Sequence, residues 1–184
     1  MMMMMRTPFD TIPCLKSDTI LLKQLTKDHA PALLELTQDQ RVYRYLPTYL
    51  FEQQYTDPYT AIRLMYEKSF PEKETLHLGI FLRRTNEFCG IAELYGYRKE
   101  ILKISLGYRL LSRFWGRGIA TNTVSLLISY LYSQTNIEII TASTMIENIA
   151  SARVLEKNGF LCTARRVPED WGYPQMTLAD KWFR

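Results

Sequence analysis

The sequence predicts a mixed α/β (α+β) domain in which a mostly antiparallel sheet is flanked by helices. Three observations support this fold class. Apolar residues alternate with other residues along three neighbouring segments in the middle of the chain, the apolar spacing then changes to a helical period, and strand-like and helix-like segments alternate to the end. With 47% hydrophobic residues, 184 residues suffice for one compact core. We therefore expect a single domain over 1–184, without a repeat or a linker.

The first part of the chain contains two helix starts. The opening run of methionines lacks the zones of a signal peptide, and we expect residues 1–10 to be disordered or extended. A first strand is predicted over 20–25, and Thr26 then serves as the cap of a helix. Asp57 followed by Pro58 is typical of an N-cap with proline at the first helical position, which predicts a second helix.

The middle and the end of the chain supply the sheet. Strands over 76–82, 88–97 and 104–110 are separated by short polar turns, which predicts an antiparallel meander. A helix is predicted from Gly116 because the apolar residues after it fall on one helical face. The remaining expected elements are a strand over 137–143, a helix over 148–158 that ends at Gly159, and a closing hairpin of 160–167 with 176–183.

Composition excludes several classes of function. A net charge of +4 is too small to indicate nucleic acid, and no apolar run is long enough to span a membrane. The three cysteines are widely spaced and never form C-x-x-C, which is typical of free thiols in a reducing cytoplasm. Neither of the two histidines lies near a cysteine or another histidine at ligand spacing, so no metal site is expected.

A glycine-rich loop separates the meander from the next helix. It spans 112–118, with the sequence SRFWGRG. Gly116 and Gly118 let the main chain approach a ligand, and unpaired amides at a helix N-terminus favour phosphate. Arg113 and Arg117 add positive charge. Such a loop alone is more often an ordinary turn, and the chain has neither a G-x-x-x-x-G-K-[ST] motif nor a third glycine for a dinucleotide fingerprint.

Two motifs in order carry a family resemblance. Arg113-x-x-Gly116-x-Gly118 resembles the Q/R-x-x-G-x-G/A signature of the GNAT superfamily of N-acetyltransferases. Downstream, residues 148–160 resemble the family segment N-x-x-[AS]-x-x-x-x-x-K-x-G-F. The longer run over 107–121 is similar to the branch that contains ribosomal-protein N-terminal (alanine/serine) acetyltransferases. Asn148 alone is equally well read as a helix cap, but the two motifs together favour the family.

The resemblance implies a GNAT-like fold with splayed central strands and acetyl-coenzyme A as co-substrate. The pyrophosphate is expected on the main-chain amides of 113–118, and the pantetheine arm is expected to pair with the nearby strand like an additional strand. The cofactor-binding residues that the resemblance implies are Tyr108, Leu110, Leu111, Arg113, Gly116, Arg117, Gly118, Ile119, Ala120, Asn148 and Ser151.

The implied reaction is direct attack of an uncharged primary amine on the thioester in a ternary complex. It requires a base for the ammonium proton and a proton source for the thiolate. The tyrosine acid found in many GNAT enzymes corresponds here to Leu155, so the branch pattern indicates Ser151 instead. Glu93 and Glu169 rank equally as the base, with a water as relay, and Asp170 is a further candidate. Each carboxylate taken singly is more often a surface group.

Two function classes remain open after these arguments. One is an N-acetyltransferase that acts on a protein or peptide N-terminus or on a small amine. The other is a coenzyme A-binding protein with weak turnover that acts as a sensor or interaction partner, as a monomer or a homodimer. Five aromatic residues are expected either to shape the acceptor pocket or to pack in the core: Tyr43, Tyr45, Tyr49, Phe51 and Tyr55.

Overall fold

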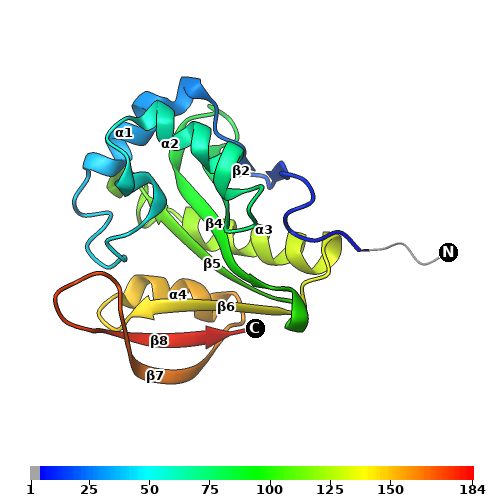
Figure 1. Ribbon diagram of the computed structural model, residues 1–184, viewed down its shortest axis with the longest axis vertical. Coiled ribbons are helices and arrows are strands. Elements are labelled where there is room, and N and C mark those ends of the chain that lie inside the picture. Colours follow the sequence, from blue (N-terminus) through cyan, green and yellow to red (C-terminus); the bar gives the residue numbers. More distant parts are fainter. Residues whose placement is uncertain (1–4) are drawn as a thin grey trace.

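Eight strands form one sheet in the order β1-β2-β3-β4-β5-β6-β8-β7, accompanied by four α-helices (Figure 1). The computed structural model describes residues 5–184, and the start of the chain over 1–4 lies outside the described residues. The strands are Leu15–Lys16 (β1), Ile20–Lys23 (β2), Thr75–Leu82 (β3), Phe88–Arg98 (β4), Lys103–Leu110 (β5), Ile139–Met145 (β6), Leu161–Glu169 (β7) and Thr177–Phe183 (β8). The α-helices are Ala30–Gln38 (α1), Pro58–Leu64 (α2), Ile119–Gln134 (α3) and Ile149–Lys157 (α4).

The start of the described chain is extended only at Arg6, which forms a β-bridge with Thr135, whereas residues 7–10 form a turn in place of the expected disordered or extended segment. Thr7 and Asp10 close a turn, because the Thr7 amide and hydroxyl both donate to the Asp10 carboxylate. The turn carries Phe9 into the core, where its ring lies 5.7 Å from that of Phe70. Burial of this aromatic side chain fixes the segment.

The order of the longer elements agrees with the prediction, and the added element is the short β1. The meander is confirmed, since β3, β4 and β5 pair antiparallel in sequence order. Helix α3 begins at Ile119, slightly later than predicted, because Gly116 and Gly118 have φ of 70° and 77° and cannot belong to a right-handed helix. In the C-terminal hairpin, β8 lies against β6 and leaves β7 at the edge.

The helix boundaries follow the local signals that predicted them. The carboxylate of Asp57 accepts a hydrogen bond from the amide of Tyr59 at 3.1 Å, so it caps α2, and Pro58 is the first helical residue. Gly159 has φ 81° directly after α4, as expected for a left-handed helix end. Four 3-10 turns and one π-helical segment complete the helical content of the described residues. The 3-10 turns are Lys27–His29, Phe51–Gln54, Lys99–Ile101 and Ser112–Phe114, and the π-helical segment is Met65–Ser69.

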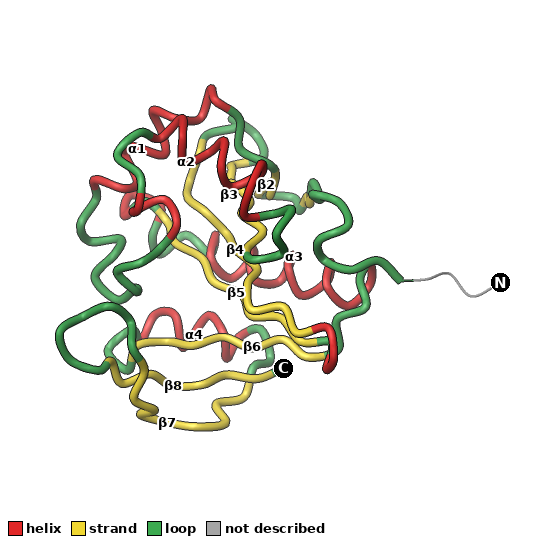
Figure 2. Tube along the Cα trace, viewed as in Figure 1, coloured by secondary structure: helices red, strands yellow, loops and turns green. Residues whose placement is uncertain are grey.

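The two faces of the sheet are covered by different helices. Successive residues of a strand point to opposite faces, so Tyr108 and Arg109 of β5 look in opposite directions. Tyr108 reaches Ser151 of α4, whereas Arg109 reaches Glu52 in the turn between α1 and α2. Figure 2 shows α1 and α2 together at one end of the molecule and α4 beside β6, β7 and β8 at the other. Within residues 5–184, no helix combines the length and apolarity needed to cross a membrane.

The sheet opens between β5 and β6. These two strands are parallel, and their pairing covers only Lys103–Ser105 against Ile139–Thr141. From Thr141 onward β6 pairs with β8 instead, while β5 continues to pair with β4 on its other side. The second half of β5 thus has no strand partner on the β6 side. This confirms the splayed central strands that the family resemblance implied.

Candidate active site

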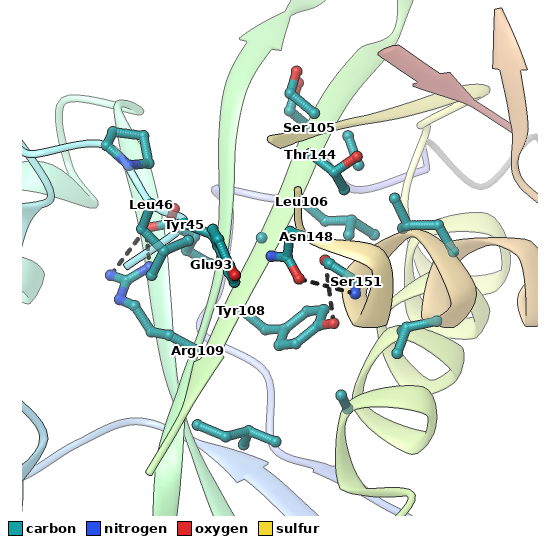
Figure 3. Close-up of a pocket in the computed structure, with 18 of the residues that line it drawn as sticks. Tyr45, Leu46, Glu93, Ser105, Leu106, Tyr108, Arg109, Thr144, Asn148 and Ser151 are labelled. Atoms are coloured by element: carbon teal, nitrogen blue, oxygen red, sulfur yellow. Dashed lines mark hydrogen bonds and ion pairs between the residues drawn. The ribbon is translucent and has the colours of Figure 1, made fainter. Parts of the chain in front are cut away.

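A cavity of about 1090 Å³ lies where β5 and β6 separate. It is lined from both faces of the sheet and from the loop before α3 (Figure 3). Most of the predicted site residues line it: Glu93, Tyr108, Leu110, Gly116, Arg117, Gly118, Ile119, Ala120, Asn148, Ser151 and Glu169. The sequence motifs therefore converge on one space, which has a donor end at the N-terminus of α3 and an acceptor end near Glu93.

The donor end presents main-chain amides. Gly118 is the N-cap of α3. The first amide of the helix that donates an i to i−4 hydrogen bond is that of Asn122, which donates to the Gly118 carbonyl at 3.0 Å. The amides of residues 119–121 have no hydrogen-bond partner within the described chain. A Cβ at Gly116 or Gly118 would meet no atom within 4 Å, so these glycines serve the positive φ and leave open space beside the amides. This geometry suits an anion.

Two predicted donor residues lie outside this space. Arg113 pairs with Glu35, lies 3.6 Å from Glu87, and does not line the cavity. The prediction that its guanidinium meets phosphate therefore finds no support, because acidic neighbours already engage it. Leu111 is buried in the core, and its amide donates to the carbonyl of Cys89. Arg117 remains the loop arginine at the cavity.

Tyr108, Asn148 and Ser151 form a cluster on the α4 side of β5 (Figure 3). The Asn148 side-chain oxygen accepts from the Ser151 amide at 3.2 Å, so Asn148 does cap α4, and its amide NH₂ is left as a donor. The Tyr108 hydroxyl donates to the Ser151 hydroxyl at 3.3 Å. Burial raises the pKa of Tyr108, which keeps its proton in place. Leu155 is a core residue at 2% exposure.

Glu93 marks the acceptor end on the opposite face of the sheet. Its side chain is 12% exposed, and burial raises the pKa of its carboxyl. His77 lies beside it on β3, with Nε2 3.7 Å from Oε2 of Glu93. Both ring nitrogens of His77 lack a hydrogen-bond partner in the described part of the chain. Polar atoms buried in this way are usually satisfied by water, so the gap beside Glu93 suits a bound water.

The other carboxylates are engaged differently. One oxygen of Glu169 pairs with Lys181, and the other accepts from the Trp171 indole at 2.8 Å. Asp170 accepts from the amide of Gly172 and does not line the cavity. Both oxygens of Glu169 are therefore neutralised or hydrogen-bonded. In Glu93 only Oε2 is engaged, by Arg109, and Oε1 has no hydrogen-bond partner in the described part of the chain.

The aromatic residues of the segment before α2 were expected either to shape the acceptor pocket or to pack in the core, and some of them line the cavity while others pack away from it. Tyr45, Tyr49 and Phe51 line the cavity. Tyr43 donates to Glu52 at 3.0 Å, and Tyr55 packs on the ring of Phe51 at 5.1 Å between centroids. This segment is tied to the loop between β7 and β8, because the amide of residue 48 donates to the carbonyl of residue 171 at 2.8 Å.

Sequence reasoning missed four functional candidates: the Tyr108 hydroxyl, His77, Arg109 and Glu52. The sequence held a signal for His77 and Arg109. Each stands inside a predicted strand of alternating apolar residues, and a histidine or an arginine that is buried there requires a polar partner. Glu52 is 1% exposed, yet it stands in a polar loop segment where nothing marks it as buried.

Comparison with known proteins gives the family. The model of the GNAT acetyltransferase domain matches residues 19–161, and the chain belongs to this family. The relative named uncharacterized N-acetyltransferase YoaA, from Bacillus subtilis (strain 168), is 26% identical over 148 residues, which is 80% of this chain and 82% of the relative. The family and this relative's name agree with the acetyltransferase prediction.

Two solved structures share the fold. One is the ribosomal L7/L12 alpha-N-protein acetyltransferase RimL in complex with coenzyme A, with a TM-score of 0.79 and 18% identity over 94% of this chain and 97% of that chain. The other is spermidine N-acetyltransferase from Vibrio cholerae in complex with coenzyme A and spermine, with a TM-score of 0.75 and 15% identity over 91% and 96%. At these identities the likeness extends to the fold alone.

The residues present fit the coenzyme A that the family implies. The unpartnered amides at the start of α3 suit a pyrophosphate, and the free edge of β5 suits an extended amide chain. Arg117, Arg153 and Lys157 add positive charge along the same side of the cavity. Across residues 5–184, no group of three or more His, Cys, Asp or Glu side chains is arranged to hold a metal ion.

Proposed function

We propose that this chain transfers an acetyl group from acetyl-coenzyme A to a primary amine of a protein or peptide N-terminus or of a small molecule. One observation carries the proposal: a single cavity crosses the sheet at the β5–β6 opening and joins the free amides of α3 to the carboxylate of Glu93. An anion site and a buried base on opposite faces are the two parts that amine acetylation needs.

The donor half assigns binding to the main chain. The amides of residues 119–121 and the positive end of the α3 dipole hold the pyrophosphate, and Arg117 adds charge. The Asn148 side-chain NH₂ and the free edge of β5 hold the pantetheine arm. When bound, acetyl-coenzyme A supplies the acetyl group as a thioester.

The acceptor half assigns the base to Glu93. A carboxyl whose pKa is raised by burial takes a proton more readily than an exposed one. Glu93 removes the ammonium proton through a water held beside His77, whose Nε2 is 3.7 Å away. Glu169 is the weaker candidate, because Lys181 and Trp171 occupy its two oxygens.

The departing sulfur is assisted from the α4 side. The Ser151 hydroxyl donates a hydrogen bond to the developing thiolate, and the Tyr108 hydroxyl orients it by donating a hydrogen bond to Ser151 Oγ while keeping its own proton. The thiolate then takes its proton from solvent. This arrangement places a tyrosine behind the serine, whereas the position of the family's tyrosine acid is filled by the buried Leu155.

The test measures thiol release from acetyl-coenzyme A with a panel of amines and N-terminal peptides. Wild-type protein is expected to release thiol with at least one member of the panel. Glu93→Gln is expected to lower turnover about 100- to 10,000-fold, while affinity for acetyl-coenzyme A is unchanged. Glu169→Gln, the matched control on the second carboxylate, is expected to lose less than about tenfold.

Two outcomes would overturn the assignment. Tight binding of acetyl-coenzyme A without thiol release across the whole panel would favour the coenzyme A-binding sensor or interaction protein. A larger loss in Glu169→Gln than in Glu93→Gln would move the base to the β7–β8 side.

A further inference from the structure

A buried ion pair lies next to the acceptor end and has no part in the chemistry proposed above. Glu52 is 1% exposed and Arg109 is 3% exposed. The Nε of Arg109 meets one oxygen of Glu52, and its Nη2 lies 2.6 Å from the other. The Tyr43 hydroxyl also donates to Glu52. A pair buried to this degree is costly to desolvate and often no more stabilising than apolar residues of the same size, so stability alone does not explain it.

The same guanidinium also reaches Glu93. Nη1 and Nη2 of Arg109 lie 3.2 Å and 3.3 Å from Oε2 of Glu93. Gly107 pairs in register with Glu93 on the same face and has no side chain to crowd that carboxylate. A Cβ at this glycine would lie 3.3 Å from Oε1 of Glu93. Arg109 thus bridges two carboxylates on one face of the sheet.

The charges of this cluster are unequal. Burial raises the pKa of Glu93, Arg109 opposes that rise, and Glu52 adds to it. Burial also acts to raise the pKa of Glu52, but Arg109 outweighs it and holds this pKa below its usual value. Glu52 and Arg109 are therefore charged near pH 7, and the ionisation of Glu93 depends on the balance between them.

Other groups around Glu93 add no net charge near pH 7. They come from every element packed against it: His77 on β3, Tyr95 on β4, Tyr49 in the loop after α1, and Glu169 with Lys181 on β7 and β8. Burial lowers the pKa of His77 to about 3 and raises the pKa values of both tyrosines. The histidine and the tyrosines are neutral, and the Glu169–Lys181 pair cancels.

We propose that Arg109, anchored by Glu52, is a positioning residue that fixes the carboxylate of Glu93 at the acceptor end and keeps it ionised. The inference rests on the proposed role of Glu93 as the base. The two members of the pair act on Glu93 in opposite directions: Arg109 favours its charged form, and Glu52 disfavours it. By engaging Arg109, Glu52 moderates this attraction, so that Glu93 stays basic enough to accept a proton.

The test follows the titration of Glu93 itself in the full-length chain. The protein is labelled with ¹³C-carboxyl glutamate, and the Glu93 signal is the one missing from Glu93→Gln. In Arg109→Met the midpoint is expected to rise by about 1 to 3 pH units, and in Glu52→Gln to fall by about 1 unit. Arg109→Lys keeps the charge and is expected to stay near wild type. Arg113→Met, an arginine paired with Glu35 outside the cavity, is the matched control and is expected to leave the midpoint unchanged.

A double variant guards against misfolding of the single ones. Arg109→Met with Glu52→Gln removes both members of the buried pair, so Glu52 is not left as an unpaired ion, and the midpoint of Glu93 is expected above wild type but below that of Arg109→Met. The proposal is overturned if the two single variants move the midpoint in the same direction, or if neither moves it. If the titration midpoint of Glu93 moves as expected while the acid limb of the pH profile of kcat/KM stays in place, that result supports the role of Arg109 and contradicts the proposal that Glu93 is the base.

Discussion

The proposed donor end of the cavity presents main-chain amides, whereas the proposed acceptor end presents side chains. The donor end depends on two glycines with positive φ and on the free amides at the start of α3, all within one short loop and one helix turn. The acceptor end depends on Glu93, Arg109, Glu52 and His77, which come from three strands and a loop. A local backbone site is altered by substitutions that change its main-chain conformation, while a dispersed side-chain cluster is altered by replacing any one of its side chains.

The largest expected effect is at the donor end. Gly118→Glu forces a side chain onto a residue with φ 77° and adds negative charge at the anion site. We expect affinity for acetyl-coenzyme A to fall about 30- to 700-fold, since strain and repulsion each cost on the order of 1 to 2 kcal/mol and 1.4 kcal/mol is about tenfold in affinity. Isothermal titration calorimetry measures the loss. Gly159→Glu is the control, because φ is 81° there and the residue does not line the cavity. Equal losses in both variants would contradict the phosphate assignment.

A smaller effect is expected where the two ends meet at the thioester. Ser151→Ala and Tyr108→Phe each remove one hydroxyl of the hydrogen-bonded pair on the α4 side. A thiol with a pKa of about 8.5 leaves readily, so we expect turnover to fall only about tenfold in each. The double variant is expected to lose no more than Ser151→Ala, because both hydroxyls act in one chain. Steady-state thiol release measures this, and additive losses would mean that Tyr108 acts independently.

A change at Gly107 is expected to affect the acceptor end without touching the donor end. Its Cβ would lie 3.3 Å from Oε1 of Glu93, so Gly107→Val displaces that carboxylate. Turnover is expected to fall several-fold to about 100-fold, as for a catalytic group misplaced by a fraction of an ångström to one ångström. Affinity for acetyl-coenzyme A is expected to remain at the wild-type value in the same preparation. A loss of affinity with unchanged turnover at saturation would contradict the division of the cavity.

The last effect is of a different kind, because it concerns stability and its dependence on pH. Burial lowers the pKa of His77 to about 3, so the folded state disfavours a proton that the unfolded chain binds below about pH 6.5. The stability that this neutral histidine contributes is complete above that pH and is lost as pH falls toward 3. The loss is about 1.4 kcal/mol per pH unit. Urea unfolding at several pH values is expected to show this slope in wild type and not in His77→Gln. His29→Gln, at a less buried histidine, is expected to keep most of it.

The same contrast explains what the sequence could predict. Strand alternation, the Asp57-Pro58 start and the glycine at 159 are local signals, and the elements they predicted are present. The open amides at the start of α3 were also predictable, because they follow from glycine spacing at a helix start. The Glu52–Arg109 pair was not, since residues so far apart in the chain are brought together only by packing. The contact of Arg113 with Glu35 could not be predicted either, because no motif reveals it, and the phosphate role of Arg113 stays a prediction.

The most direct test of the two-ended cavity is residue-resolved amide hydrogen exchange with and without coenzyme A. The amides of Ile119, Ala120 and Thr121 have no partner in the described chain, so they are expected to exchange rapidly in the free protein. Saturating coenzyme A is expected to protect these three amides strongly, while amides on the edge strand β7 remain unchanged. Exchange at residues 119–121 that stays the same at saturation would contradict the account.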